Sequence, residues 1–394
     1  MQHLLLISPN HNLRGQLCAE LNRFGYTATC IEQLSKASEQ PHPPALCLVD
    51  LQFQREVDFA QWQDWLRDCR TSHTACLGFD SGASADRSAI APLEPLCDIL
   101  DDALDQTRLQ EKVTGLLTIR KLTRQLETTR RQLASYQSEL QEALQSAAHI
   151  QRSLIPLCCP KYHNLNYAWR FMPSKQVGGD LFNVVQLDEQ TVMTYLVDVS
   201  GHGISSAMVT VSVHQSLSLH TSQIIKQYLD QPPYYTINEP KMVLEELEAE
   251  YPFERFEEFF TISYMLINPH TGVLRYCNAG HPPPLLLRHD GSVERLEQGG
   301  TVIGMGSSVS FEQGATQLQP GDRLYLYTDG ITEHIDDDGE AYGEERFLTQ
   351  LKAQSQQDLG SAIQNALIAM RQFGGSALPV DDVTLVGIEY ASKA

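Results

Sequence analysis

An aspartate that follows a buried strand is the feature that most constrains how this chain can fold. Residues 192–197 form a largely apolar run that predicts a buried strand, and Asp198 comes directly after it, before a loop with Gly201 and Gly203. A buried carboxylate is costly unless a partner neutralises it. The two glycines allow the backbone to turn sharply and to approach a ligand closely. The stretch therefore predicts either a metal site or a tight turn that Asp198 caps.

Three further aspartate sites occupy similar positions. Asp180 follows two glycines, Asp329 follows an alternating strand, and Asp381 and Asp382 come directly before another strand. Each alone could be an ordinary turn aspartate. Four such sites together predict a carboxylate cluster built by converging strands, and this oxygen-rich, thiol-free set suits hard divalent cations such as Mg²⁺ and Mn²⁺.

Five motifs, in this order, carry a family resemblance: GGD (178–180), DVSGHG (198–203), NAGHPP (278–283), YTDG (327–330) and DDVT (381–384). The chain from about residue 150 to 388 resembles the metal-dependent PPM (PP2C-like) serine/threonine phosphatases, and most closely the bacterial SpoIIE/RsbU branch, which governs sporulation and stress sigma factors. Five motifs in the right order are far more specific than any one of them. The resemblance implies an α+β phosphatase domain, an α/β/β/α sandwich, over residues 156–394.

The resemblance also implies a binuclear site for two divalent cations, Mn²⁺ or Mg²⁺. The residues that it points to as metal-binding are Asp180, Asp198, Val199, Asp329, Asp381 and Asp382. Asp198 would bridge the cations, the Val199 carbonyl would be a further ligand, and Asp180 would act directly or through water; Asp198 and Asp180 are the catalytic candidates. Asp382 is secondary, because neighbouring side chains of an extended segment point in opposite directions.

Three other positions near these motifs bear on the chemistry. The family often has an aspartate where this chain has Asn183, which lowers the negative charge and would weaken a metal. His202, in the metal loop, either donates a proton to the leaving oxygen or shapes the loop. His281, between a glycine and three prolines, is predicted to be structural.

Residues 1–103 alternate predicted strands and helices, which indicates a doubly wound parallel α/β sheet. The predicted strands are 3–7, 45–49 and 74–78, with a helix at 13–24. The pattern resembles a response-regulator receiver domain with Asp50 as the candidate phospho-acceptor. Ser8-Pro9 replaces the acidic pair of receivers, and residues 95–100 contain no lysine after the last strand. We therefore expect a degenerate receiver that works through contacts with an upstream signalling protein.

Residues 104–155 predict a long helix that ends before Pro156. Apolar residues alternate at spacings of three and four over several heptads, and one heptad position holds Ile119, Leu126, Leu133, Leu140, Ala147 and Leu154. This is typical of a coiled coil and predicts a homodimer. The alternative is a single amphipathic helix that lies on its own domain.

The composition narrows the class of function. The 394 residues predict two or three domains, and the formal net charge of −20 excludes a nucleic-acid partner. We find no apolar run long enough for a membrane span and no secretory leader at the start. Nine scattered cysteines without a C-x-x-C pair, Cys158-Cys159 among them, indicate a reducing, cytoplasmic setting.

The predicted function is a dimeric protein phosphatase that acts on a phosphoserine or phosphothreonine protein. By resemblance, its substrate is an anti-sigma-factor antagonist in a partner-switching pathway. The alternative is a non-catalytic scaffold that binds such a partner. A DNA-binding response regulator is excluded by the acidic charge and by the lack of a basic recognition helix.

Overall fold

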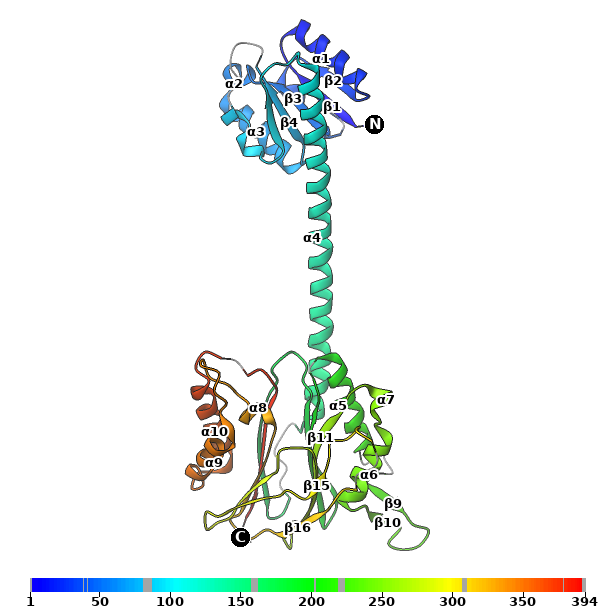
Figure 1. The fold of residues 1–394 in the computed structure, drawn as a ribbon, viewed down its shortest axis with the longest axis vertical. Helices are drawn as coiled ribbons and strands as arrows, with labels where there is room; N and C mark the ends of the chain where they lie inside the picture. Colours follow the sequence, from blue (N-terminus) through cyan, green and yellow to red (C-terminus); the bar gives the residue numbers. More distant parts are fainter. Residues whose placement is uncertain are drawn as a thin grey trace. The chain divides into compact units, whose positions relative to one another are not determined.

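The computed structural model describes residues 2–37, 39–40, 42–80, 87–156, 162–201, 203–218, 224–306, 310–377 and 379–391. The chain divides into two compact units, residues 1–138 and 139–394 (Figure 1). One helix, α4 (Gln106–Leu154), contributes to both units. No helix in the described ranges is long and apolar enough to cross a membrane.

The first unit is built on a five-stranded parallel sheet in the order β2-β1-β3-β4-β5. Its strands are β1 (His3–Ile7), β2 (Thr27–Ile31), β3 (Leu46–Asp50), β4 (Ala75–Phe79) and β5 (Cys97–Leu100). Its helices are α1 (His11–Arg23), α2 (Phe53–Glu56), α3 (Phe59–Thr71) and the first turns of α4, with short 3-10 turns at Leu34–Ala37, Arg87–Ala89 and Ala91–Leu93. This strand order is a doubly wound order, so the predicted fold class is confirmed.

Apolar side chains cover both faces of this sheet because alternate residues of each strand point to opposite sides. Leu4 and Leu6 of β1 pack with Leu17 of α1 and Val113 of α4. The alternate residues of β1, which point to the other face of the sheet, pack against α3. The first turns of α4 are therefore part of the first unit's core.

The second unit contains two sheets that pack face to face. One has the order β15-β12-β11-β8-β7, with β16 paired to β12, and the other has the order β14-β13-β17-β18-β6. Figure 1 shows α9 and α10 on one side of the paired sheets and α5 and α6 on the other, which confirms the predicted α/β/β/α sandwich.

The strands of this unit are β6 (Leu165–Met172), β7 (Asp180–Asp188), β8 (Thr191–Val199), β11 (Phe260–Ile267), β12 (Val273–Ala279), β13 (Leu285–Leu287), β14 (Val293–Arg295), β15 (Gly299–Gly300), β16 (Gly314–Gln317), β17 (Arg323–Tyr327), β18 (Val383–Tyr390) and the separate hairpin β9 (Lys226–Tyr228) and β10 (Tyr235–Ile237). The helices are the end of α4, α5 (Ile204–Ser216), α6 (Pro240–Glu250), α7 (Phe253–Phe256), α8 (Asp329–Thr332), α9 (Gly343–Ala353) and α10 (Leu359–Phe373). The sequence analysis predicted neither β7 nor the β9-β10 hairpin.

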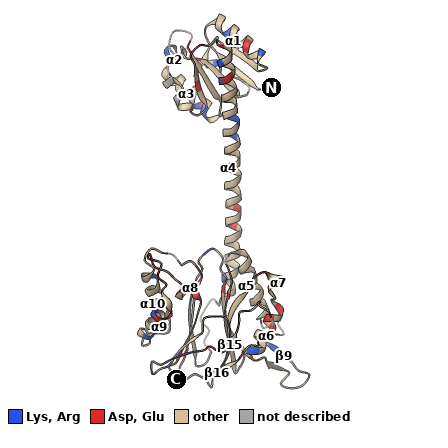
Figure 2. Ribbon diagram, in the orientation of Figure 1, with Lys and Arg blue, Asp and Glu red and all other residues tan. Residues whose placement is uncertain are grey.

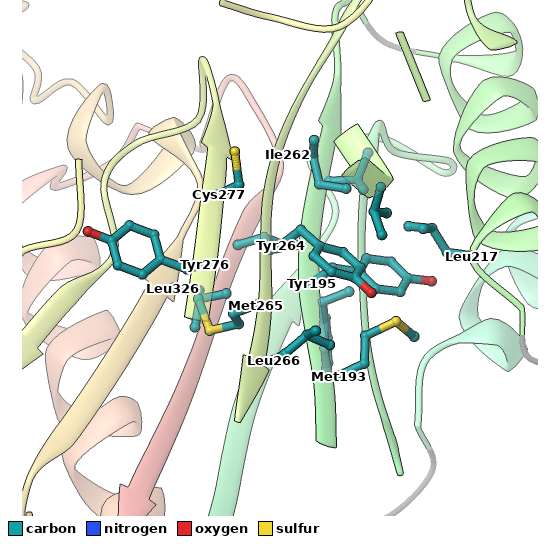
Figure 3. Packing of buried hydrophobic residues seen from close by; sticks show 14 of the residues in the cluster. Met193, Tyr195, Leu217, Ile262, Tyr264, Met265, Leu266, Tyr276, Cys277 and Leu326 are labelled. Atoms are coloured by element: carbon teal, nitrogen blue, oxygen red, sulfur yellow. The ribbon is translucent and has the colours of Figure 1, made fainter. Parts of the chain in front are cut away.

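The packing of β8 decides which way its aspartate faces. Figure 3 shows Tyr195 directed toward Leu217, at the end of α5, whereas Met265 of the neighbouring strand is directed toward Leu326 of the second sheet. On the opposite face of β8 from Tyr195, the Thr194 hydroxyl hydrogen-bonds the Tyr167 hydroxyl of β6 at 3.1 Å. Because side chains alternate along a strand, Asp198 lies on the same face as Thr194, toward the second sheet.

Candidate active site

Asp180 and Asp198 lie directly opposite each other in the antiparallel pair of β7 and β8. Asp180 is almost fully buried, and its Oδ2 accepts hydrogen bonds from the hydroxyls of Thr328 at 2.9 Å and Thr384 at 2.5 Å. Both threonines belong to the second sheet's end, so two sheets hold one carboxylate. Burial raises the pKa of Asp180 well above its ordinary value, and the carboxylates of Asp198 and Asp382 add to this shift.

The other aspartates converge on the same place. Burial raises the pKa of Asp198 to about 8, and repulsion from Asp329, Asp381 and Asp382 adds to the shift. Burial also raises the pKa of Asp329 to about 6, with Glu333 and Asp381 contributing. Figure 2 marks acidic residues at α8, which begins with Asp329. The structure therefore brings the five predicted aspartates into one cluster, which we call the aspartate cluster.

The donor chemistry of this cluster fits divalent cations. Its oxygens come from carboxylates, and a Cβ placed on Gly179 would lie 2.5 Å from the Val199 carbonyl oxygen, so the backbone passes unusually close at this point. A like-charged, partly desolvated set of carboxylates is stabilised when a cation binds. Within the described ranges, no three acidic, histidine or cysteine side chains already stand in an ion-binding arrangement. A cation would thus have to draw these side chains closer together.

Asp382 has a different environment from the other aspartates. Its Oδ2 accepts from the Gly179 amide at 2.7 Å, and its Oδ1 accepts from the Ser174 amide at 2.7 Å and the Ser174 hydroxyl at 3.1 Å. A Cβ on Gly178 would lie only 2.0 Å from the same carboxylate. Asp382 therefore ties the loop before Asp180 to the start of β18.

Gln151 is a site residue that sequence reasoning missed. It lies in the last turn of α4, is buried, donates from Nε2 to the Gly178 carbonyl at 2.7 Å and accepts from the Gly178 amide at 3.2 Å. The Thr210 hydroxyl of α5 donates to the next carbonyl, that of Gly179, at 2.8 Å. The glycine turn before Asp180 is thus held by α4 and α5. Gln151 gave no signal because a polar residue is unremarkable in an amphipathic helix, whereas Thr328 and Thr384 stood within the quoted motifs.

Asn183 does not replace a carboxylate of the aspartate cluster. It pairs with Tyr195 across β7 and β8, and a hydrogen bond from Asn183 opposes the rise that burial causes in the pKa of Tyr195. It stands three positions after Asp180 along an extended strand, so the two side chains lie on opposite faces of the sheet. The substitution therefore does not change the charge of the cluster.

Of the histidines and the cysteine pair that the sequence analysis named, His281 lies among the described residues. His281 is buried, its Nδ1 hydrogen-bonds the Thr261 hydroxyl at 2.7 Å, and burial lowers its pKa to about 3, so the ring is neutral. This supports the structural role predicted for it. His202 and Cys158-Cys159 lie outside the described residues.

Asp50 ends β3 of the first unit and is fully buried. Its Oδ2 accepts from the Ser8 hydroxyl at 2.8 Å, and its Oδ1 accepts from the Gln52 amide at 3.2 Å. Arg14 donates to the Ser8 carbonyl at 2.7 Å, which fixes the residue that stands where receivers have an acidic group. The candidate phospho-acceptor is therefore at the predicted place but enclosed by hydrogen bonds.

Comparison with known proteins identifies the second unit. A family model described as Stage II sporulation protein E (SpoIIE) matches residues 188–391, a range that includes all the predicted metal-binding residues except Asp180. The phosphoserine phosphatase RsbU of Bacillus subtilis (strain 168) is 24% identical over 263 residues, which cover 64% of this chain and 72% of RsbU. The phosphoserine phosphatase RsbP of the same organism is 31% identical over 165 residues, 41% of this chain and 38% of RsbP.

A solved structure confirms the fold. The SiaA-PP2C domain of Pseudomonas aeruginosa superposes with a TM-score of 0.53 at 18% identity, and the match covers 65% of this chain and 99% of that domain.

Proposed function

We propose that this chain, which belongs to the Stage II sporulation protein E (SpoIIE) family, is a metal-dependent protein serine/threonine phosphatase. The observation that carries the proposal is the convergence of five aspartates at one end of two packed sheets, with Asp180 and Asp198 directly opposite each other. The names of the relatives RsbU and RsbP, both phosphoserine phosphatases, support the reaction class.

The cofactors that we propose are two divalent cations, Mn²⁺ or Mg²⁺. Asp198 would bridge them, Val199 would contribute its carbonyl, Asp329 and Asp381 would hold the second cation, and Asp180 would act on the first directly or through water. When bound, such a pair lowers the pKa of a water molecule and stabilises the attacking and leaving oxygens of phosphate hydrolysis. The hydrogen bonds at Asp382 support a loop-holding role for this residue rather than a role as a direct ligand.

The chain's own residues fix the direction of these carboxylates. Two threonine hydroxyls donate to Oδ2 of Asp180, so this side chain keeps one orientation toward Asp198. A carboxylate that is already held in its reactive orientation needs little reorganisation on the way to the transition state. Thr328 and Thr384 are therefore positioning residues in this proposal.

Metal-free protein should become less stable as pH rises. A buried aspartate with a raised pKa holds a proton that the unfolded chain has already released, so its contribution to stability is lost between the unfolded value near 3.8 and the folded values of about 6 and about 8. We expect a lower unfolding temperature at pH 8.5 than at pH 5 in EDTA, and the reverse with Mn²⁺. Thermal unfolding of wild type and Asp198→Asn measures this. If the unfolding temperature of the wild type in EDTA fell with pH no more steeply than that of Asp198→Asn, the prediction would be contradicted.

The substrate that we propose is a phosphorylated anti-sigma-factor antagonist in a partner-switching pathway. The phosphatase proposal is tested by incubating the full chain with candidate phosphoserine antagonist proteins and with a chromogenic phosphate ester, with Mn²⁺ and with EDTA. Phosphate release that requires the metal is the expected result. Tight binding of a phosphoprotein without turnover under every metal condition would instead identify a non-catalytic scaffold.

We also propose that α4 forms a homodimer with a second copy of the chain. Between its two packed ends, Leu122, Leu126, Leu133 and Leu140 recur at coiled-coil spacing and are each more than half exposed. Exposed leucines at this spacing are the side chains that a parallel partner helix buries. Their exposure argues against the alternative of a single amphipathic helix packed on its own domain.

The receiver-like unit would regulate the phosphatase through contacts with an upstream signalling protein. Because Asp50 is buried and bonded to Ser8, we expect small phosphodonors to label it only in trace amounts. Mass spectrometry after incubation with acetyl phosphate and Mg²⁺ measures the labelled fraction. Stoichiometric labelling that disappears in Asp50→Ala would show a working receiver.

A further inference from the structure

A cavity of about 280 Å³ lies in the first unit, at the end of its sheet opposite to Asp50. Pro44, which comes just before β3, and Thr74, which comes just before β4, line it where these strands begin. Leu5 and Cys47 line it from the sheet, and Trp65 lines it from α3. The volume is at the lower end of the range for small-molecule sites, so it suits a ring with a short side chain.

The buried side chains that line this cavity are apolar apart from Thr74, whose hydroxyl donates to the Pro44 carbonyl at 3.2 Å. Leu5, Cys47, Trp65 and Cys69 are all nearly buried. Contact with Cys47, together with burial, raises the pKa of the Cys69 thiol far above its ordinary value, so this thiol stays protonated. Neutral thiols behave as small hydrophobic groups. The lining thus offers an aromatic face and soft apolar contacts to a ligand.

Among the described residues that line the cavity, Asp68 is the one carboxylate and His42 is the one titratable base, while Arg120 and Arg124 bond backbone carbonyls nearby. Asp68 lines the cavity one position before Cys69, and its carboxylate is close enough to that thiol to affect its pKa. The hydroxyls of Thr71 and Ser72 donate to the Asp68 backbone carbonyl at 3.1 and 2.7 Å, so they are already used within the rim. An apolar interior with a single carboxylate at its mouth favours a ligand that carries one positive charge.

The rim of the cavity is also held by α4. Arg120 donates from Nε to the His73 carbonyl at 2.7 Å, and Arg124 donates to the Ser72 carbonyl at 2.7 Å. His73 further pairs with Glu127 at 2.9 Å and has a left-handed backbone, with φ of 49°. A change in the backbone position of the rim would therefore alter its contacts with α4, the helix whose later heptads form the proposed dimer seam.

We propose that this cavity binds a small organic ammonium compound with an apolar body, and that its occupancy reaches α4 through the contacts of Arg120 and Arg124 with the rim. The binding does not depend on the phosphatase proposal. An effect of the ligand on turnover, in contrast, would rest on the phosphatase proposal. Such a ligand would give the receiver-like unit an input that does not require phosphorylation of the enclosed Asp50.

Binding is tested by titrating the full-length protein with 2-phenylethylamine, with phenylacetate and 2-phenylethanol as the anionic and neutral matches. A ligand of this size should bind the wild type with a dissociation constant on the order of 1 mM. We expect at least about tenfold weaker binding for Asp68→Asn, and loss of binding for Ala37→Trp, which fills the cavity. Asp64→Asn, one turn earlier on α3 and outside the cavity, should bind as wild type does.

Three results would overturn the site: no saturable binding, equal affinity for phenylacetate, or binding that Asp68→Asn leaves unchanged. Asp68 is exposed, so this variant remains informative even if Ala37→Trp fails to fold. Hydrogen exchange of residues 118–130 tests the coupling. The amine should alter exchange there in wild type but not in Arg120→Gln/Arg124→Gln, which should still bind it. Unchanged exchange in saturated wild type would show that the cavity is not coupled to α4.

Discussion

Replacing Asp198 with alanine should lower manganese-dependent phosphate release by about 10³-fold or more while the protein keeps its fold. The change removes the carboxylate that we propose bridges both cations, and β8 carries no second acidic residue. Folding should persist because burial and three neighbouring carboxylates already disfavour the charged form of Asp198, whose pKa is raised to about 8. Metal-free Asp198→Ala should therefore unfold at a temperature no lower than that of the wild type at pH 8.

Asp188→Ala is the matched control for this experiment. Asp188 ends β7, the strand that Asp180 begins, and its carboxylate accepts only from the Gln190 amide of the following turn among the contacts resolved for it, at 2.8 Å. We expect this variant to keep turnover within about twofold of the wild type, as surface substitutions usually leave a fold intact. Wild-type turnover by Asp198→Ala in Mn²⁺ would remove Asp198 from the site.

The double variant Leu133→Asp/Leu140→Asp should be monomeric, and its turnover should differ several-fold from that of the wild type. Both leucines are 55% exposed in the single chain, so charges there leave each folded unit intact. In a paired helix they would be buried, where unpaired charges are costly. The effect should reach the aspartate cluster because the last turn of α4 carries Gln151, which hydrogen-bonds both polar atoms of the Gly178 backbone. A packed two-helix seam has discrete arrangements, and these can bias such a contact.

Ser138→Asp/Gln145→Asp is the control for the seam. It adds the same two charges at the same seven-residue spacing, but at exposed positions on the helix face away from the leucines. Light scattering and phosphate release on the same samples should show a dimer with wild-type kinetics. A monomeric wild type, or a seam variant that loses the dimer with unchanged turnover, would reduce α4 to a linker.

The sequence predicted the strands that carry most of the site because their periodicity is strong. The buried run before Asp198 and the alternating run before Asp329 both correspond to observed strands, β8 and β17. Asp180 was expected at a glycine turn, and the strand that begins with it was missed, because two glycines mask the start of a strand. β2 was missed for another reason: its side chains are mostly half-exposed and give no apolar run.

The contacts that hold the site could not be predicted because they join residues far apart in the chain. Asp382 bonds Gly179 over 203 positions, and Thr384 bonds Asp180 over 204. Periodicity and spacing report on local structure, whereas these hydrogen bonds depend on how two sheets pack. The wrong expectation about Asn183 has a similar origin, since the strand that places it on the opposite face from Asp180 was itself not predicted.

The most direct test of the central proposal is phosphate release from a phosphoserine antagonist protein, measured on one preparation of the full chain in EDTA and then after addition of Mn²⁺. We expect no turnover above background in EDTA, recovery on addition of Mn²⁺, and loss of that recovery in Asp198→Ala and Asp329→Ala but not in Asp188→Ala. Turnover that persists in EDTA, or that both cluster variants retain, would contradict a metal-dependent phosphatase built on the aspartate cluster.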